Sequence, residues 1–199
     1  MRNSNLYLVS LVLVAILGGL LFGYDTAVIS GAEQALQKHL GLNAFWHGVT
    51  ASSALIGCVI GGAISGVCAS RMGRRKSLRL SAVLLFLSAL GSYYPEFIFF
   101  EKGDTSFSLI LAFNFYRILG GVGVGLASAI SPMYIAEVAP SEIRGKLVSC
   151  NQFAVIFGML VVYFVNYMIK DGMTEEVLVS EGWRKMFVSE AYPAAVFGI

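Results

Sequence analysis

Charged residues are scarce in this chain, and their scarcity argues against a soluble domain. Only 13% of the 199 residues are Asp, Glu, Lys or Arg, and 57% are hydrophobic, whereas average domains carry about 25% charged residues. The hydrophobic residues form long runs between short polar islands, without the alternation of an amphipathic helix or strand. This pattern predicts an all-α polytopic membrane protein in a lipid bilayer. The net charge of only +2 gives no basic face for nucleic acid.

Metal ligands and catalytic groups are also scarce. The chain has 3 cysteines and 2 histidines, with neither a Cys-x-x-Cys pair nor a histidine cluster. Cys58, Cys68 and Cys150 lie in or beside apolar segments, where we expect them to pack as small residues without a disulfide or metal role. No nucleophile–base set accompanies them, so we expect no cofactor, no metal site and no enzyme activity.

The apolar runs predict one N-terminal transmembrane bundle over residues 1–199. A spanning helix needs about 20 mostly apolar residues. The last run is shorter and contains Glu190 and Pro193, so we expect the chain to stop inside a membrane helix. The expected helices cover about 6–31, 48–70, 78–94, 108–134, 147–169 and 183–199.

The first apolar run also resembles a secretory signal, but it is long for one and lacks a clear cleavage site, so we favour a retained helix. Lys and Arg are concentrated at the N-terminus and after the second and fourth runs. Because basic loops stay in the cytoplasm, this bias predicts a cytoplasmic N-terminus. The residues concerned are Arg2, Arg71, Arg74, Arg75, Lys76, Arg79, Arg144 and Lys146.

Small residues recur at four-residue spacing within the apolar runs, a pattern that lets membrane helices approach closely. We expect these glycines to pack helices; a dinucleotide-binding loop would need a preceding strand and a soluble βαβ unit. The pairs and triplets are Gly19/Gly23, Gly57/Gly61/Ser65, Gly62/Gly66 and Gly121/Gly125.

Three ionisable residues fall inside the expected membrane helices, namely Asp25, Arg117 and Glu190. An unpaired charge there costs at least ~2.5–3.5 kcal/mol, so such a residue is by default a hypothesis about function. We expect Asp25 and Arg117 to face the bundle interior and to pair. A proton on Asp25 would release Arg117 and couple proton movement to a conformational change; the alternative is a static ion pair that fixes helix packing.

Two further polar sets have both a functional and a structural interpretation. Arg74, Glu137 and Arg144 lie at helix ends expected on the inner side, where they form either a latch between helices or ordinary positive-inside anchors. Gln152 and Phe22 could offer an amide and an aromatic face to one sugar, since an amide both donates and accepts hydrogen bonds; interhelical packing is the alternative.

Several motifs resemble the N-terminal half of the sugar porter family of the major facilitator superfamily, and within it the bacterial D-xylose/proton symporters. The resemblance covers nearly the whole chain, with the motifs in the family's order. They are GGLLFGYDTAVISG (18–31), RMGRR (71–75), YRILGGVGVGLAS (116–128), SPMYIAE (131–137), IRGK (143–146), NQFAVIFG (151–158) and GWRKMFVSE (182–190).

The resemblance implies a six-helix bundle of two inverted three-helix repeats, which would form half of an alternating-access transporter in a bacterial cytoplasmic (inner) membrane. Its substrates would be a monosaccharide, either a pentose or a hexose, and a proton. Asp25 and Arg117 fall on the proton-coupling pair and Glu190 on a second acidic residue linked to coupling. Gln152 and Phe22 fall on sugar contacts, and the inner latch residues named above fall on the intracellular charge network.

Departures from the family pattern leave three hypotheses open. Met159 stands where a sugar-binding glutamine is expected, so the sugar is not determined. Ser70 replaces an acidic residue before the RMGRR loop. The C-terminal bundle is absent from the sequence. The chain is therefore part of a longer proton-coupled sugar symporter, a non-transporting remnant of one, or a half-transporter that needs a companion chain.

Overall fold

The protein is a bundle of helices. The computed structural model describes residues 2–96 and 107–198, and no strand occurs among them, which confirms the all-α prediction. The long helices are α1 (Arg2–Leu40), α2 (Ala44–Met72), α3 (Arg74–Tyr93), α4 (Phe107–Val138) and α5 (Arg144–Asp171). The shorter elements are α6 (Glu175–Val177), the π-helix η1 (Leu178–Gly182), α7 (Trp183–Val188) and α8 (Ala191–Gly198).

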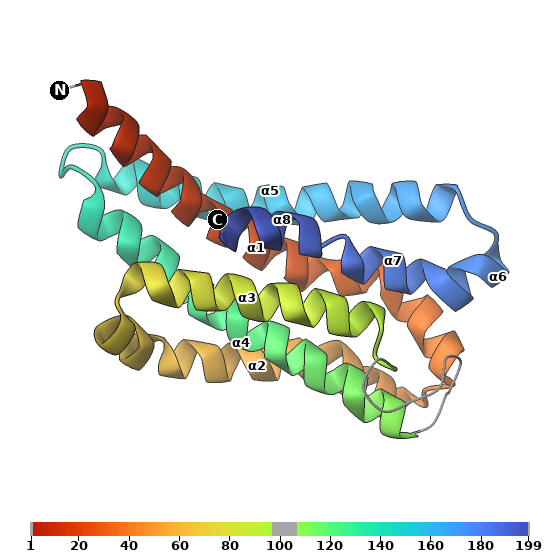
Figure 1. The fold of residues 1–199 in the computed structure, drawn as a ribbon. Helices are drawn as coiled ribbons and strands as arrows, with labels where there is room; N and C mark the ends of the chain where they lie inside the picture. The colour runs from red at the N-terminus through yellow and green to blue at the C-terminus, as the bar shows by residue number, and fades with distance from the viewer. Residues whose placement is uncertain (1, 97–106, 199) are drawn as a thin grey trace.

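The helices pack in a pattern that brings distant parts of the sequence together (Figure 1). α2 and α3 both pack against α4, α1 packs against α5, and α7 and α8 lie along α1 and α3. The buried apolar side chains form two clusters. The first cluster joins α1, α4, α5 and α7 around Phe113 and Trp183, and the second joins α2, α3, α4 and α8 around Leu85 and Ile130.

Helix ends follow from local sequence. The Asn43 side chain accepts a hydrogen bond from the Trp46 backbone N–H at 2.9 Å and so caps the start of α2. Gly73 separates α2 from α3 with a φ of 81°, a backbone conformation that glycine adopts without steric cost.

The first and last helices differ from the expected ranges. α1 continues to Leu40 through the expected polar island, because Ala32, Ala35, Leu36 and Leu40 recur on one face and are buried in the first cluster. The expected helix over 183–199 is divided into α7 and α8. Pro193 has no N–H to bond the carbonyl of residue 189, so the helix breaks at Ser189 and Glu190, before α8 begins. Ile199 lies outside the described residues.

The predicted close approach of glycine-bearing helices is confirmed at three of the four sets. A Cβ atom on Gly57 or Gly121 would collide with the backbone carbonyl of Ile118 or Ala54, across the α2–α4 contact. Gly61 and Gly125 meet α4 and α2 backbone in the same way, and Gly19 and Gly23 meet α5. Gly62 and Gly66 instead face open space. Glycine therefore lets α2 and α4 touch backbone to backbone.

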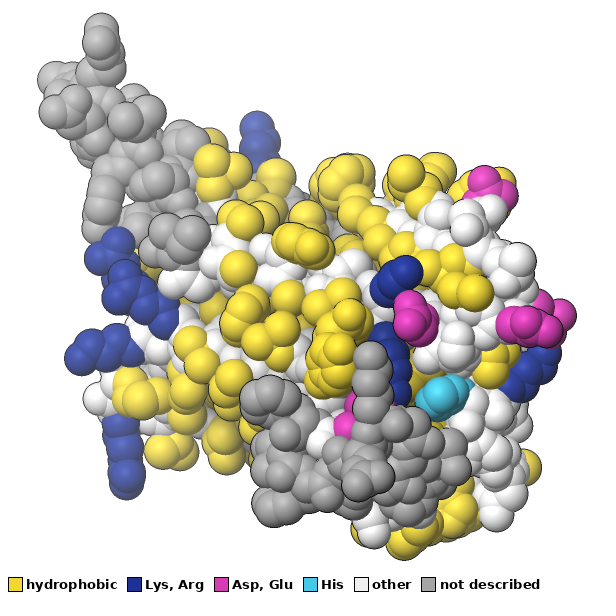
Figure 2. Space-filling view, turned by 45° about the vertical axis from the view of Figure 1, so that its right-hand side comes forward, with side chains coloured by type: hydrophobic (Ala, Val, Ile, Leu, Met, Phe, Trp, Pro, Cys, Tyr) yellow, Lys and Arg dark blue, Asp and Glu magenta, His cyan; other side chains and the backbone are white. Residues whose placement is uncertain are grey.

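The surface suits a membrane. Three described helices, α2, α4 and α5, are long and apolar enough to cross one. Hydrophobic side chains cover the middle of the molecule in Figure 2. Lys and Arg side chains gather at the end where the chain begins, and most of the visible Asp and Glu side chains lie toward the other end.

Candidate functional site

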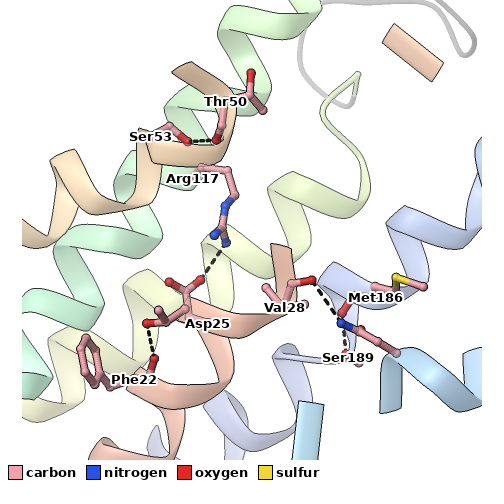
Figure 3. Close-up of polar contacts among 10 residues, drawn as sticks. Phe22, Asp25, Val28, Thr50, Ser53, Arg117, Met186 and Ser189 are labelled. Carbon is pink, nitrogen blue, oxygen red and sulfur yellow. Dashed lines mark hydrogen bonds and ion pairs between the residues drawn. The ribbon is translucent and has the colours of Figure 1, made fainter. Parts of the chain in front are cut away.

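An ion pair lies at the centre of the bundle. Arg117 Nη1, from α4, donates a hydrogen bond of 2.7 Å to Asp25 Oδ1, from α1. Each side chain is only 2% exposed, and Figure 3 shows the guanidinium pointing at the carboxylate. The structure thus brings together the two residues that the sequence analysis expects to pair.

Glu190 adds a third buried charge to this centre. It lies in the break between α7 and α8, is 1% exposed, and is close enough for the charges of both Asp25 and Arg117 to act on it. Its Oε1 has no hydrogen-bond partner among the described residues. Two carboxyl groups with one guanidinium are neutral together only when one carboxyl holds a proton. We call Asp25, Arg117 and Glu190 together the charge cluster.

The charge cluster lies where the two apolar clusters meet. On α4, Arg117 separates Phe113 of the first cluster from Val124 of the second. Across the α7–α8 break, Glu190 separates Phe187 of the first cluster from Ala194 of the second. The charge cluster therefore lies among apolar side chains, where ionised groups carry a large desolvation cost.

One aromatic ring lies against the arginine, and a second ring packs behind the first. The Arg117 guanidinium carbon lies 5.0 Å from the centre of the Phe187 ring, within the range of a cation–π contact. Phe187 also packs edge-on against Phe113, with ring centres 5.4 Å apart. Phe187 is not among the residues expected from the sequence; its position one turn before Glu190 is the only signal that the sequence offers.

Hydrogen bonds tie the α7–α8 break to α1. The Tyr24 and Ser189 hydroxyl oxygens lie 2.8 Å apart, and Ser189 Oγ also donates to the Met186 carbonyl at 2.5 Å. Asn166 of α5 donates to the Val28 carbonyl at 3.2 Å (Figure 3). Tyr24 and Ser189 are not among the residues expected from the sequence, although each stands next to a residue of the charge cluster along the chain.

The expected sugar contacts remain accessible. Gln152 on α5 is exposed, and Phe22 on α1 is partly buried beside the second apolar cluster. Thr26 Oγ1 donates to the Phe22 carbonyl at 2.7 Å. Met159, which stands at the expected glutamine position, packs against the first apolar cluster. An exposed amide and a partly buried aromatic ring therefore lie on the neighbouring helices α5 and α1.

The expected inner latch is formed in part. Arg74 donates to Glu137 Oε1 through Nε at 3.1 Å and through Nη2 at 2.7 Å, which links α3 to the end of α4. Its Nη1 also binds the Ala69 carbonyl at 3.2 Å. Arg144 differs from the expectation: it donates to the Ala139 carbonyl at 3.4 Å and makes no ion pair with a described carboxylate. Arg144 reaches the α4 end because only a short turn separates α4 from α5.

A known family matches this arrangement. The family model described as "Sugar (and other) transporter" matches residues 11–199. The chain belongs to this sugar transporter family. The family is one of transporters, not of enzymes.

Individual relatives in the sugar transporter family agree with the fold. The chain is 53% identical to the D-xylose-proton symporter of Escherichia coli K12, over 98% of this chain and 42% of the symporter. It is 42% identical to the arabinose-proton symporter of Bacillus subtilis, over 91% of this chain and 36% of the relative. It thus spans less than half the length of these relatives, each of which is a single longer chain.

A solved structure agrees as well. The proton:xylose symporter XylE of the major facilitator superfamily, bound to 6-bromo-6-deoxy-D-glucose, matches with a TM-score of 0.92 and 50% identity. The match covers 98% of this chain and 44% of XylE. The fold is therefore that of one part of a major facilitator transporter.

Proposed function

We propose that this chain is the N-terminal bundle of a proton-coupled symporter for a D-xylose-like sugar, working by alternating access. The observation that carries the proposal is the buried Asp25–Arg117 pair with Glu190 beside it. Ionisable groups buried within membrane helices commonly serve proton relays. The matched relatives named as proton symporters support the same function.

The charge cluster would couple the proton to motion through its charge balance. With both carboxyl groups ionised the cluster carries one excess negative charge, and with one proton it is neutral. A proton on Asp25 weakens its hold on Arg117, so the contact between α1 and α4 loosens. Such a switch requires two discrete arrangements of the packed helices. One proton then shifts the equilibrium from one arrangement to the other.

The sugar would bind beside the charge cluster. Gln152 would donate and accept hydrogen bonds with hydroxyl groups, and Phe22 would lie against an apolar face of the ring. Met159 stands where the family pattern has a sugar-binding glutamine. Its thioether sulfur is only a weak hydrogen-bond acceptor, so the hydrogen bonds of that glutamine to the sugar would be lost.

The end of the bundle that is rich in Lys and Arg would face the cytoplasm of a bacterial cell. Lys and Arg gather at the end where the chain begins, as expected for cytoplasmic loops. There the Arg74–Glu137 pair would latch the inner side, with Arg144 fixing the α4–α5 turn. Both members of the pair are about 40% exposed, so the pair contributes no more than about 1 kcal/mol and opens readily.

Uptake of labelled D-xylose by proteoliposomes tests the proposal. The chain is continued after Ile199 by the remaining part of the E. coli D-xylose-proton symporter, and an inward proton gradient is imposed. We expect accumulation against the sugar gradient, and its loss in Asp25→Asn. The chain alone is measured in parallel, since uptake by it would point to a self-sufficient half-transporter. Accumulation by the Asp25→Asn protein at the unmodified rate would contradict the proposal.

A further inference from the structure

A second, largely buried ion pair joins α7 to the chain just beyond α3. The end of α3 and the start of α7 lie toward the end of the bundle away from the N-terminus (Figure 1). Arg184 of α7 binds both carboxylate oxygens of Glu96, just beyond α3; its Nη1 lies 2.8 Å from Oε2, and its Nη2 binds Oε1. Nη1 also donates to the Tyr93 carbonyl at 2.9 Å. The two side chains are only 12% and 4% exposed. We call this set the α3–α7 clamp.

The clamp acts on a short helix that the core also holds, since Trp183, Met186 and Phe187 are buried in the first apolar cluster. α7 is short, with the π-helix η1 before it and the break at Ser189 and Glu190 after it. At the end of α7, the Ser189 N–H still bonds the Lys185 carbonyl at 3.2 Å, but the Glu190 N–H bonds the Phe187 carbonyl at 3.2 Å, so the hydrogen-bond spacing changes at the break. The bidentate arginine–carboxylate contact adds a directional constraint to this short helix.

The same short helix reaches the charge cluster through packed aromatic rings. The Arg184 guanidinium lies 4.5 Å from the centre of the Trp183 ring. Trp183 packs on Phe113, and Phe113 packs on Phe187, with ring centres 5.9 and 5.4 Å apart. Phe187 contacts Arg117, as described above. Glu190 follows Arg184 by six residues, about 9 Å along a helix at 1.5 Å per residue.

We propose that the α3–α7 clamp is a positioning device for proton coupling, which holds Phe187 against Arg117 and Glu190 beside Asp25. The proposal rests on the function proposed above. Apolar residues packed between α3 and α7 would serve stability equally well, since buried ion pairs often add none. What the ion pair adds is a fixed position of α7 along α3. The charge cluster needs that fixed position, whereas apolar packing by itself would tolerate a shift.

Two transport modes separate positioning from mere support. Proteoliposomes with the continued chain are assayed for proton-driven D-xylose accumulation and for exchange of D-xylose without a gradient. Exchange needs no net change in protonation, whereas accumulation does. In Glu96→Gln and in Arg184→Lys we expect accumulation to fall about tenfold or more, a change typical of coupling between sites, while exchange stays within about threefold.

Matched controls use the same end of the bundle. Glu181→Gln removes an exposed carboxylate, which makes no closer contact than 3.9 Å with the exposed Lys185. We expect this variant to leave both accumulation and exchange unchanged. Glu96→Asp keeps the charge and recovers part of the accumulation lost in Glu96→Gln.

Three results would overturn the proposal alone: equal loss of both modes, loss of neither, or failure of both clamp variants to fold, which would assign the clamp to stability. Absence of accumulation by the unmodified continued chain would overturn the proposed function as well.

Discussion

At the scale of single residues, the buried Asp25–Arg117 pair is the most consequential feature. Neither partner reaches water, so removing one leaves the other as an uncompensated buried charge. Breaking such a pair typically costs about 3–5 kcal/mol, whereas replacing both partners with apolar residues is often neutral.

This asymmetry gives a stability prediction. Asp25→Leu is expected to lower the free energy of unfolding by about 3–5 kcal/mol, and Asp25→Leu combined with Arg117→Leu by much less. Unfolding of the purified chain in detergent, followed by circular dichroism, measures both. Equal costs for the single and double variants would show that the pair is not the source of the effect.

A second residue-scale prediction concerns pH. Burial by itself would raise the pKa of Glu96, but the hydrogen bonds and charge of Arg184, together with a backbone hydrogen bond and the nearby His39, outweigh burial, and the pKa lies below the ordinary 4.5. A lowered native pKa contributes stability that is complete above the unfolded-state pKa and is lost as the pH falls through the native value. The Arg184–Glu96 pair should therefore stabilise the chain at pH 7 and lose this effect in acid.

Thermal unfolding of the chain and of Glu96→Gln between pH 7 and pH 3 measures this effect. The difference in Tm should be largest at neutral pH and should shrink below about pH 4.5, where the carboxylate of the unfolded chain takes up its proton. A difference that stays constant over this range would show that the charge of Glu96 does not stabilise the fold.

At the scale of helices, the contact between α2 and α4 depends on glycines, which have no side chain to hold the two backbones apart. Gly121→Val is expected to force the two backbones apart and to prevent folding, because its Cβ atom meets the Ala54 carbonyl. Gly62→Val is the matched control, since nothing lies near its Cβ position. Protein yield and size-exclusion profiles compare the two; equal behaviour would contradict the close helix contact.

The helices also show how far sequence reasoning extends. Apolar runs predicted the long helices, and small-residue spacing predicted close helix contacts without identifying which helices meet. The pairing of Asp25 with Arg117 followed from the cost of unpaired charge in a membrane. The continuation of α1 to Leu40 does not follow from the apolar runs, because residues 32–40 form an amphipathic segment: its buried face is apolar, and polar residues lie on the other face.

Other features were beyond the sequence for a physical reason. Glu96 and Arg184 lie 88 residues apart, and only tertiary packing brings them together. Arg144 binds a carbonyl instead of the expected latch, since local turn geometry offers that acceptor first. The roles of Gln152 and Phe22 stay predictions, because accessibility alone does not identify a ligand.

At the scale of the whole molecule, charge and packing have a common organisation. Two apolar clusters fill the bundle, and the charge cluster lies between them. The chain spans 42% of the E. coli D-xylose-proton symporter. In the function proposed above, this bundle would carry the coupling residues, and the rest of the transporter would complete the sugar site.

Proton movement that accompanies the sugar is the most direct test of the central claim. Proteoliposomes holding the continued chain and an internal pH-sensitive dye receive external D-xylose without an imposed pH gradient. The account predicts that the interior acidifies with the unmodified protein and that Asp25→Asn abolishes this signal. Sugar entry without acidification by the unmodified protein, or unchanged acidification by Asp25→Asn, would contradict proton coupling through the Asp25–Arg117 pair.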